Sequence, residues 1–362
     1  MTTRKETTTS FEEVEVERRF ISVPGFEETT KGKEIIGKPF TVATFNVLAN
    51  DYATFQKRPQ EYLEWKQRLP RITEQIHKMK ADVVCVQEID EYNELKEKLK
   101  EEEEEEEEEI YEGIFAKRPM TKDGCAIFVR KKRFKIVKQL PTLEFNDMSG
   151  MKFVTEIIGT GIGTQMSVQT GNICVAVLIE DKTTTTTTTT GKGKGKGKTT
   201  TPPILIAVPH FHWNPVLTHV KIMQAARLVM YLTREGNRHK ATHIIIGGDF
   251  NSLPRSAVIE FLTRGCVQRT NEDLMKFCPK FNISHELQLS SAYDSFGNPP
   301  TNFTSDFTGC IDYILFTQRT LAVSHVLQPH SPFTSDGNHP LFLPDDKNPS
   351  DHVPIAACFV RF

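Results

Sequence analysis

The 362-residue sequence lacks the features that mark secreted, membrane and thiolate-metal proteins. Its seven cysteines are scattered and include no C-x-x-C pair, which argues against a disulfide framework and a zinc-thiolate site. No window approaches a membrane span, and the N-terminus has no apolar signal core. The run of glutamates between residues 12 and 17 also argues against a mitochondrial presequence. We therefore expect reduced cysteines and a cytoplasmic protein, with a nuclear or organellar location left open.

The formal charge of −2 conceals a mildly basic body. Removing the nine glutamates of Glu101–Glu109 changes the formal charge to +7, and four of these positive charges belong to the Gly-Lys repeat Gly191–Lys198. Such a charge is compatible with a nucleic-acid enzyme but does not establish one. The repeat is not a phosphate-binding loop, because no GxxxxGK[ST] followed by a helix is present.

Two low-complexity inserts interrupt what otherwise looks like one large domain. The Glu run at 101–109 is typical of a solvated helix extension or a disordered tract. The Thr and Gly-Lys tract at 183–200 cannot pack a core, and its place between two strand-like runs predicts a long disordered hairpin loop. We expect a loosely attached polar arm over residues 1–39 and a single domain over residues 40–362.

Hydrophobic patterning predicts an α/β fold in which two packed mixed sheets are flanked by helices. Strand-like runs begin at Thr41 and occupy Val83–Val86, Ile173–Ile179, Ile204–Val208, Thr242–Ile246, Ile311–Phe316 and Val353–Phe359. Helical spacing covers Glu61–Lys80, Tyr92–Lys100, His219–Arg234 and Ser256–Leu262. Pro70 is expected to break or restart the first of these helices.

Four short strings place polar side chains at the ends of apolar runs. They are Thr44-Phe45-Asn46-Val47-Leu48, Val86-Gln87-Glu88, Gly248-Asp249-Phe250-Asn251-Ser252 and Ser350-Asp351-His352. Together they supply three amide side chains, three carboxylates and an imidazole. Strand ends on a rigid sheet can hold such groups around one phosphate, and the set suits a magnesium-dependent phosphodiesterase.

Each residue type suggests a role in that chemistry. Glu88 is the first choice for a direct metal ligand, with Asn46 beside it. Asp249 can orient and deprotonate a water or hold a second metal, and Asn251 can fix that water or the phosphate. A protonated His352 can donate to a phosphate oxygen, and Asp312, an acid inside an apolar strand, is its natural partner.

Alternative interpretations accompany several of these residues. Taken alone, each string is more often structural than catalytic, and Asp249-x-Asn251 could cap the next helix. His210 and His212 follow a strand in Pro209-His210-Phe211-His212-Trp213-Asn214-Pro215. They could belong to a packed loop or a transition-metal site. No third His or Cys follows at ligand spacing, so we favour one imidazole that faces the phosphate.

In order, these motifs resemble those of the endonuclease/exonuclease/phosphatase superfamily over about residues 41–362 without the inserts. Four further strings resemble the carbon catabolite repressor four-type poly(A) deadenylases and their nocturnin and Angel relatives. They are Asp123-Gly124-Cys125-Ala126-Ile127-Phe128, His210-Phe211-His212-Trp213-Asn214-Pro215, Asn251-Ser252-Leu253-Pro254 and Leu289-Ser290-Ser291-Ala292-Tyr293. The resemblance implies a four-layer α/β sandwich with two magnesium ions, for which manganese may substitute.

The resemblance also implies roles for individual residues. Glu88, Asn46, Asp249 and Asp351 would surround the metal ions, Asp312 would support His352, and His210 would contact the scissile phosphate. Adenine would lie between Pro215 and Phe307, with Asn251 and Asn302 beside it. Stacking between an aromatic ring and a proline suits a base, although Phe307 alone would more often be a core residue.

The implied function is a magnesium-dependent 3′-exoribonuclease that shortens poly(A) and releases 5′-AMP. A nocturnin-like NADP(H) 2′-phosphatase, a 2′,5′-oligoadenylate phosphodiesterase and an inactive RNA-binding module remain alternatives. The expected partner is RNA with a 3′ poly(A) tail or another adenine nucleotide. Three departures from the family pattern are the absence of leucine-rich repeats for docking onto a deadenylase complex, the short basic loop Ala116–Lys122 and the two inserts.

Overall fold

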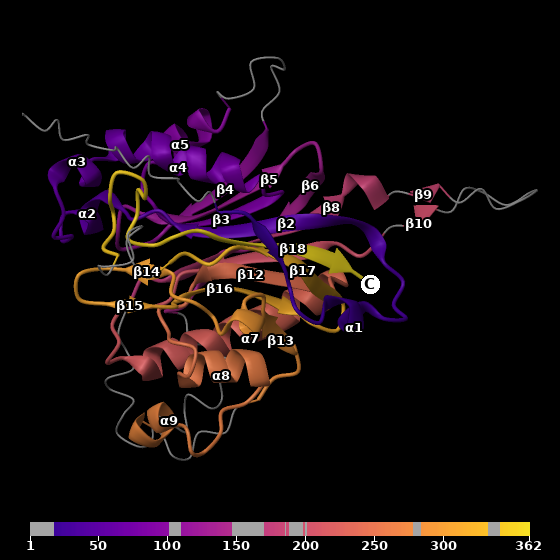
Figure 1. The fold of residues 1–362 in the computed structure, drawn as a ribbon. Coiled ribbons are helices and arrows are strands. Elements are labelled where there is room, and N and C mark those ends of the chain that lie inside the picture. Colours follow the sequence, from indigo (N-terminus) through magenta and orange to yellow (C-terminus); the bar gives the residue numbers. More distant parts are fainter. Residues whose placement is uncertain are drawn as a thin grey trace, which may run out of the picture.

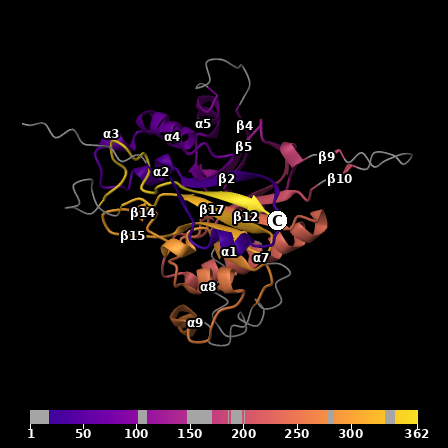
Figure 2. The same ribbon diagram turned by 45° about the vertical axis from the view of Figure 1, so that its right-hand side comes forward.

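The computed structural model describes residues 18–100, 110–146, 170–184, 186–187, 198–199, 201–277, 284–331 and 341–362. Two seven-stranded mixed sheets pack against each other, and helices cover both outer faces (Figures 1 and 2). This arrangement confirms the predicted four-layer α/β sandwich. The Glu run at 101–109 lies outside the described residues.

The first sheet has the strand order β1-β17-β18-β2-β3-β5-β4. Its strands are β1 (Phe20–Ser22), β17 (Leu321–Leu327), β18 (Ile355–Arg361), β2 (Ile36–Asn46), β3 (Val83–Ile89), β5 (Gly124–Arg130) and β4 (Tyr111–Lys117). β2 and β3 are parallel, and the other neighbours are antiparallel.

The second sheet has the order β13-β16-β12-β11-β8-β6, and the short strand β7 also pairs with β8. Its strands are β13 (Leu289–Ser291), β16 (Asp312–Thr317), β12 (His243–Asp249), β11 (Ile204–Pro209), β8 (Ile173–Asp181), β6 (Phe134–Gln139) and β7 (Leu143–Glu144). Two small hairpins lie outside these sheets, β9 (Thr186–Thr187) with β10 (Lys198–Thr199) and β14 (Asn302–Phe303) with β15 (Thr308–Gly309).

Helices form the two outer layers. Those that belong to the first half of the chain are α1 (Phe26–Thr30), α2 (Asn50–Ala53), α3 (Gln60–Leu63), α4 (Trp65–Met79) and α5 (Tyr92–Lys98). Those of the second half are α7 (Thr218–His239), α8 (Ala257–Arg264) and α9 (Glu272–Phe277). Single 3₁₀ turns occupy Lys182–Thr184 and Asp294–Phe296.

Alternating side chains of the strands fill three separate apolar layers. On β2, Phe40 and Val42 face the second sheet, whereas Ala43 and Phe45 face α4 and α5. On β11, Ile204 and Ile206 likewise point between the sheets, and their neighbours point toward α7 and α8. This two-residue period places one core between the sheets and one beneath each helical layer.

Two β-α-β units meet at one end of the sandwich. β2 connects to the parallel strand β3 through α4, and β11 connects to the parallel strand β12 through α7. Gly248 permits the second pair to approach closely, because a Cβ at this position would lie 2.2 Å from the Pro209 carbonyl oxygen. The carboxyl ends of four strands therefore converge, which is where ligands bind in such sheets.

Two local predictions from the sequence were wrong. Pro70 lies within α4 instead of ending it, and the helical segment is interrupted earlier, at Glu64. Because proline has no N–H, Pro70 cannot donate the helical hydrogen bond to the Lys66 carbonyl. Both residues are exposed, so this carbonyl is near solvent. Residues 18–39 are also more closely attached than a loose arm, since Phe20–Ser22 pair with β17 and β2 begins at Ile36.

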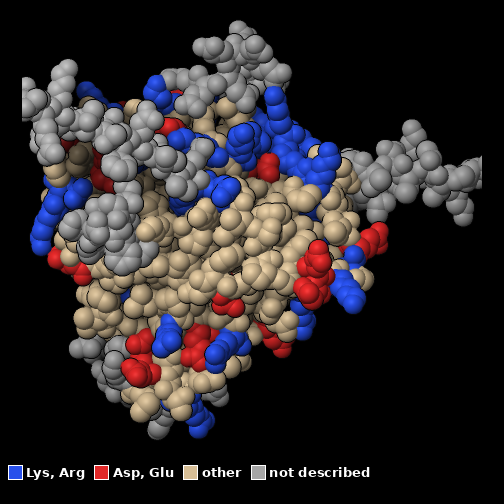
Figure 3. All heavy atoms as spheres, viewed as in Figure 1, with Lys and Arg blue, Asp and Glu red and all other residues tan. Residues whose placement is uncertain are grey.

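Positive side chains gather over β6 and β8 on the face shown in Figure 3. β6 is an edge strand, and its residues Lys135 and Lys138 are exposed. Lysines on an edge strand discourage pairing with a second sheet, so this basic region has a structural explanation.

A buried carboxylate anchors the end of β8. Asp181 Oδ2 accepts hydrogen bonds from Arg361 and from Arg133, the latter at 2.9 Å, and the Asp181 side chain is fully buried. Asp181→Ala leaves two guanidinium groups without their carboxylate, so we expect a loss of about 3–5 kcal/mol in the free energy of unfolding. Urea denaturation measures this loss. A change below about 1 kcal/mol would contradict the assigned anchoring role.

Candidate active site

The candidate site lies where the four strand ends converge. Asn46 ends β2, Glu88 is the penultimate residue of β3, Asp249 ends β12 and His210 directly follows β11. Asp312 begins β16 opposite Asp249, and His352 lies three residues before β18. The structure thus brings together six of the residues that the sequence motifs single out.

Glu88 enters the site through a local irregularity in β3. Its φ of 57° is left-handed, and the pairing of β3 with β5 changes register between Val86 and Ile89. A non-glycine residue in this conformation is typical of functional sites, where surrounding structure maintains the strain. The bulge turns the carboxylate toward β2, and the Ala49 backbone N–H donates to its Oε2 at 3.1 Å.

Asn46 separates two of the carboxylates. Its Nδ2 donates to Glu88 Oε1 at 3.0 Å and to Asp249 Oδ2 at 3.1 Å, while its Oδ1 accepts from the Leu48 N–H. Since carboxylates only accept hydrogen bonds here, the amide nitrogen must face them. In this arrangement Asn46 is a spacer between two acidic groups, and the direct metal ligation predicted for it stays a prediction.

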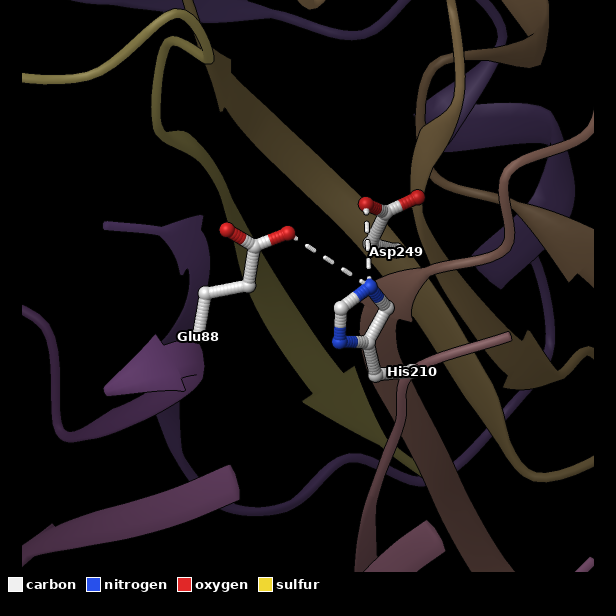
Figure 4. Close-up of side chains that lie close together, drawn as sticks. All are labelled: Glu88, His210 and Asp249. Carbon is white, nitrogen blue, oxygen red and sulfur yellow. Dashed lines mark ion pairs between the residues drawn. The ribbon is translucent and has the colours of Figure 1, made fainter. Parts of the chain in front are cut away.

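His210 faces the same two carboxylates (Figure 4). Its Nε2 lies 3.7 Å from Glu88 Oε1 and 3.7 Å from Asp249 Oδ2. Burial, with further contributions from Arg118 and His352, lowers the pKa of His210 well below its usual value. The imidazole is therefore neutral, and its buried Nδ1 has no hydrogen-bond partner among the described residues.

Asp312 and His352 form a direct pair on the other side of Asp249. His352 Nδ1 lies 2.8 Å from Asp312 Oδ2, which also accepts a 2.6 Å hydrogen bond from the Thr301 hydroxyl. His352 Nε2 then points toward Asp249 Oδ2 at 3.9 Å. Burial opposes the charged imidazole, but Asp312 and Asp351 raise the pKa of His352 well above its usual value.

Negative charge accumulates in this buried space. Burial, and next the Asp351 carboxylate, raises the pKa of Glu88 to about 7. Burial and the facing Asp312 carboxylate raise the pKa of Asp249 as well. Both shifts indicate that the ionised carboxylates lack sufficient positive charge nearby.

The residues present fit a divalent cation. Ligand atoms of Glu88, His210 and Asp249 all lie within 4.8 Å of one another, and a second such group comprises Asp249, Asp312 and His352. In the second group, two of the possible ligand atoms, His352 Nδ1 and Asp312 Oδ2, are already hydrogen-bonded to each other. The first group is therefore the better cation site. Its oxygen-rich composition suits magnesium or manganese more than zinc.

Asp351 belongs to neither group of candidate ligands. Its Oδ2 accepts from Gln56 Nε2 at 2.9 Å and from Asn302 Nδ2 at 3.3 Å. Asp351 thus holds these two amides, and its predicted role as a metal ligand stays a prediction. Asn302 is buried, and the adenine contact predicted for it stays a prediction.

Asn251 connects Asp249, at the end of β12, with the loop after β11 that carries the predicted base-binding residue Pro215. Its φ is 46°, its backbone N–H donates to Asp249 Oδ1 at 2.8 Å, and its Nδ2 donates to the Phe211 carbonyl. It is therefore not a helix cap; Ser256 caps α8. Pro215 is exposed in the loop after β11, and Phe307 is exposed in the turn between β14 and β15.

The structure identifies supporting residues that the sequence motifs did not reveal. Arg68 of α4 is fully buried and donates to the carbonyls of Val47 and Leu48 at 2.7 and 2.8 Å. Lys221 of α7 donates to the Asn251 carbonyl at 2.6 Å. A charged residue on the apolar face of a predicted helix was the available signal in both cases.

A buried ion pair also lies beside the site. Arg118 of the β4–β5 turn contacts Asp123 at 3.0 Å, and both side chains are almost completely buried. Its charge contributes to the low pKa of His210. The basic loop Ala116–Lys122 noted in the sequence therefore places one cation close to the candidate catalytic residues.

A known family of nucleases and phosphatases matches most of this chain. The model of the Endonuclease/Exonuclease/phosphatase family matches residues 43–352, and the chain belongs to this family. Among the helices that the structure describes, none has the length and hydrophobicity that a membrane crossing requires.

The chain is similar to curated subunits of CCR4-NOT complexes. It is 32% identical to "CCR4-NOT transcription complex subunit 6-like-B" of Xenopus laevis over 88% of this chain and 63% of that protein. It is 28% identical to "CCR4-Not complex 3'-5'-exoribonuclease subunit Ccr4" of Kluyveromyces lactis over 95% of this chain and 45% of that protein. The chain thus spans from under half to about three fifths of the length of these relatives.

Solved structures of two further proteins share the fold. ANGEL2, described as a 2',3'-cyclic phosphatase, superimposes with a TM-score of 0.70 at 21% identity, over 95% of this chain and 97% of that one. The human Nocturnin catalytic domain gives a TM-score of 0.58 at 21% identity, over 94% and 97%. Both belong to the group that the sequence motifs resemble.

Proposed function

We propose that this protein is a magnesium-dependent 3′-exoribonuclease that removes adenylates from poly(A) tails and releases 5′-AMP. The observation that carries the proposal is one cluster of hydrogen bonds and close ion pairs at the strand ends, which comprises Asn46, Glu88, His210, Asp249, Asp312 and His352. An inactive RNA-binding module would not need this costly concentration of carboxylates. Similarity to exoribonuclease subunits supports RNA as the substrate.

The proposed roles follow from the geometry of the side chains. Glu88 and Asp249 would hold a magnesium ion, which would neutralise charge on the phosphate oxygens, and the neutral His210 beside them would contact the scissile phosphate. Asp249 faces both histidines and would accept the proton of the attacking water. His352, kept protonated by Asp312, would donate to a non-bridging oxygen of the phosphate.

The proposed adenine slot lies beside this cluster. The side chains of Leu253 and Phe307 both pack against Gly309. A Cβ added to Gly309 would lie 2.9 Å from Leu253 and 2.6 Å from Phe307. Leu253 follows Asn251 by two residues. Asn251 is itself bonded to the carbonyl of Phe211, in the loop that carries Pro215. These contacts connect the two loops between which a base would stack.

A parallel assay of three substrates tests the proposal. Purified protein with magnesium is incubated with a 5′-labelled A-tailed RNA, with NADPH and with adenosine 2′,3′-cyclic phosphate. We expect stepwise shortening of the RNA and release of 5′-AMP, with slower turnover of the other two. Faster phosphate release from NADPH would favour the phosphatase alternative, and no turnover of any substrate would favour an RNA-binding module.

Removal of the Phe307 ring should weaken the grip on the terminal base. Loss of an aromatic stacking partner costs about 1–3 kcal/mol per base, so Phe307→Ala should lower kcat/KM on A-tailed RNA by tens-fold. Gly309→Ala is a complementary variant, because its Cβ would displace the exposed Phe307 ring without removing it. Asn302→Ala should instead narrow the difference between A-tailed and U-tailed RNA. Wild-type kinetics for Phe307→Ala would place the adenine slot elsewhere.

A further inference from the structure

Exposed apolar side chains concentrate at the catalytic end of the molecule. Of the eleven large hydrophobic residues that are exposed in the described part of the chain, seven lie in loops at this end. They are Phe55, Met120, Trp213, Val216, Leu253, Phe307 and Phe342. Loops around a catalytic centre that expose apolar and aromatic groups are typical of a surface that binds a ligand.

Phe55 is the most exposed of these residues, with 80% of its surface accessible. It follows α2, which lies at the same end of the sheets as the β14–β15 hairpin (Figure 1). An exposed aromatic ring at the rim of a candidate site is suited to stacking on a ligand such as a base.

Three consecutive side chains beside Phe55 contact other segments at this end of the molecule, and two of them, Gln56 and Arg58, hold the backbone in place. Gln56 Nε2 donates to Asp351 Oδ2 at 2.9 Å, Lys57 contacts Asp306 at 3.2 Å, and Arg58 donates to the Pro344 carbonyl at 2.7 Å. These contacts join the loop to the Ser-Asp-His segment, to the turn that carries Phe307, and to the loop before Asp345. The exposed ring is therefore presented from a pre-organised segment at the rim of the site.

Lys57 adds an accessible cation next to this ring. Both partners of the Lys57–Asp306 pair are about three quarters exposed, and such pairs contribute little to stability. A phosphate could therefore replace Asp306 as the partner of Lys57. An exposed aromatic ring beside an exchangeable cation is the combination that binds single-stranded nucleic acids.

We infer that the Phe55–Lys57 loop is a second nucleotide subsite, in which Phe55 stacks on a base upstream of the 3′-terminal adenosine and Lys57 binds its phosphate. The inference rests on the proposed function and makes it more specific. The ligand class is a single-stranded oligoribonucleotide of at least two nucleotides, because Lys57 lies 3.2 Å from Asp306, the residue before Phe307, and 5′-AMP alone would fill only the Phe307 slot.

Binding and kinetics across oligomer length test the subsite. Dissociation constants are measured in an Asp249→Asn background, for hexaadenylate by fluorescence anisotropy and for 5′-AMP by competition, and kcat/KM on hexaadenylate is measured with Asp249 intact. Phe55→Ala should weaken hexaadenylate binding and kcat/KM at least fivefold, while the dissociation constant of 5′-AMP changes less than twofold. Phe55→Tyr should retain the wild-type values. Met230→Ala, an exposed apolar residue on α7, is the matched control.

Salt dependence tests the contribution of Lys57. Lys57→Ala should reduce the slope of log affinity against log salt concentration by about 0.7 for hexaadenylate, as expected for one phosphate contact on a single strand. Lys57→Arg should restore it. Unchanged hexaadenylate binding in Phe55→Ala, or equal losses of affinity for hexaadenylate and 5′-AMP, would overturn the subsite.

Failure of the proposed function can be distinguished from failure of the subsite. If the protein binds hexaadenylate through Phe55 but cleaves no RNA, the subsite stands and the exoribonuclease assignment fails. If it cleaves A-tailed RNA and Phe55→Ala matches wild type on every length, the exoribonuclease assignment stands and the subsite fails.

Discussion

Replacement of Glu88 by glutamine should abolish hydrolysis while the fold is retained. The substitution preserves size but removes a carboxylate that faces His210 and is joined to Asp249 through Asn46. A bound cation supplies roughly 4 kcal/mol or more of transition-state stabilisation, so turnover of A-tailed RNA in magnesium should fall about a thousandfold or more. Single-turnover kinetics at saturating RNA measure this fall.

Metal binding by the Glu88→Gln variant provides a readout that is independent of activity. The wild-type protein should gain thermal stability when magnesium or manganese is added, whereas the variant should gain little. In the absence of metal, the variant should be at least as stable as wild type, because a buried negative charge beside Asp249 and Asp351 has been removed. Near-wild-type turnover in magnesium would show that Glu88 is not a ligand.

Much of the site was accessible from the sequence because of one geometric rule. Polar residues that directly follow buried strands meet when those strands are parallel neighbours, as β2 with β3 and β11 with β12. The Asp312–His352 pair could also be anticipated, since a buried acid in an apolar strand requires a partner. The sequence motifs then predicted the sandwich, and the described structure confirms it.

Other features depend on tertiary context that local patterns do not contain. The left-handed conformation of Glu88 arises from a register shift against β5, a strand remote in sequence. The role of Asn46 as a spacer depends on two carboxylates that lie 42 and 203 residues away. Proline usually breaks a helix, but the exposed position of Pro70 in α4 allows this helix to continue. Long-range contacts decide each of these outcomes.

Replacement of Asp312 by asparagine should lower kcat by about a hundredfold to ten-thousandfold. Asp312 Oδ2 accepts the hydrogen bond of His352 Nδ1 at 2.8 Å, which keeps Nε2 directed at Asp249 and the imidazole charged. An asparagine side chain can place an N–H donor in the same position and so stabilise the wrong tautomer. The equivalent change in serine proteases costs about ten-thousandfold in kcat. Thr301→Ser, which keeps the hydroxyl that bonds Asp312, is the matched control and should remain near wild type.

Metal affinity separates this effect from that of Glu88. Because Asp312 is already bonded to His352 and Thr301, we expect Asp312→Asn to retain the affinity for magnesium or manganese that Glu88→Gln loses. Nitrogen-15 NMR of the His352 ring should report the change from a charged to a neutral imidazole. If Asp312→Asn instead loses metal binding in parallel with activity, then Asp249, Asp312 and His352 act as a cation site. The histidine would then be a ligand, and its proposed contact with a phosphate oxygen would be wrong.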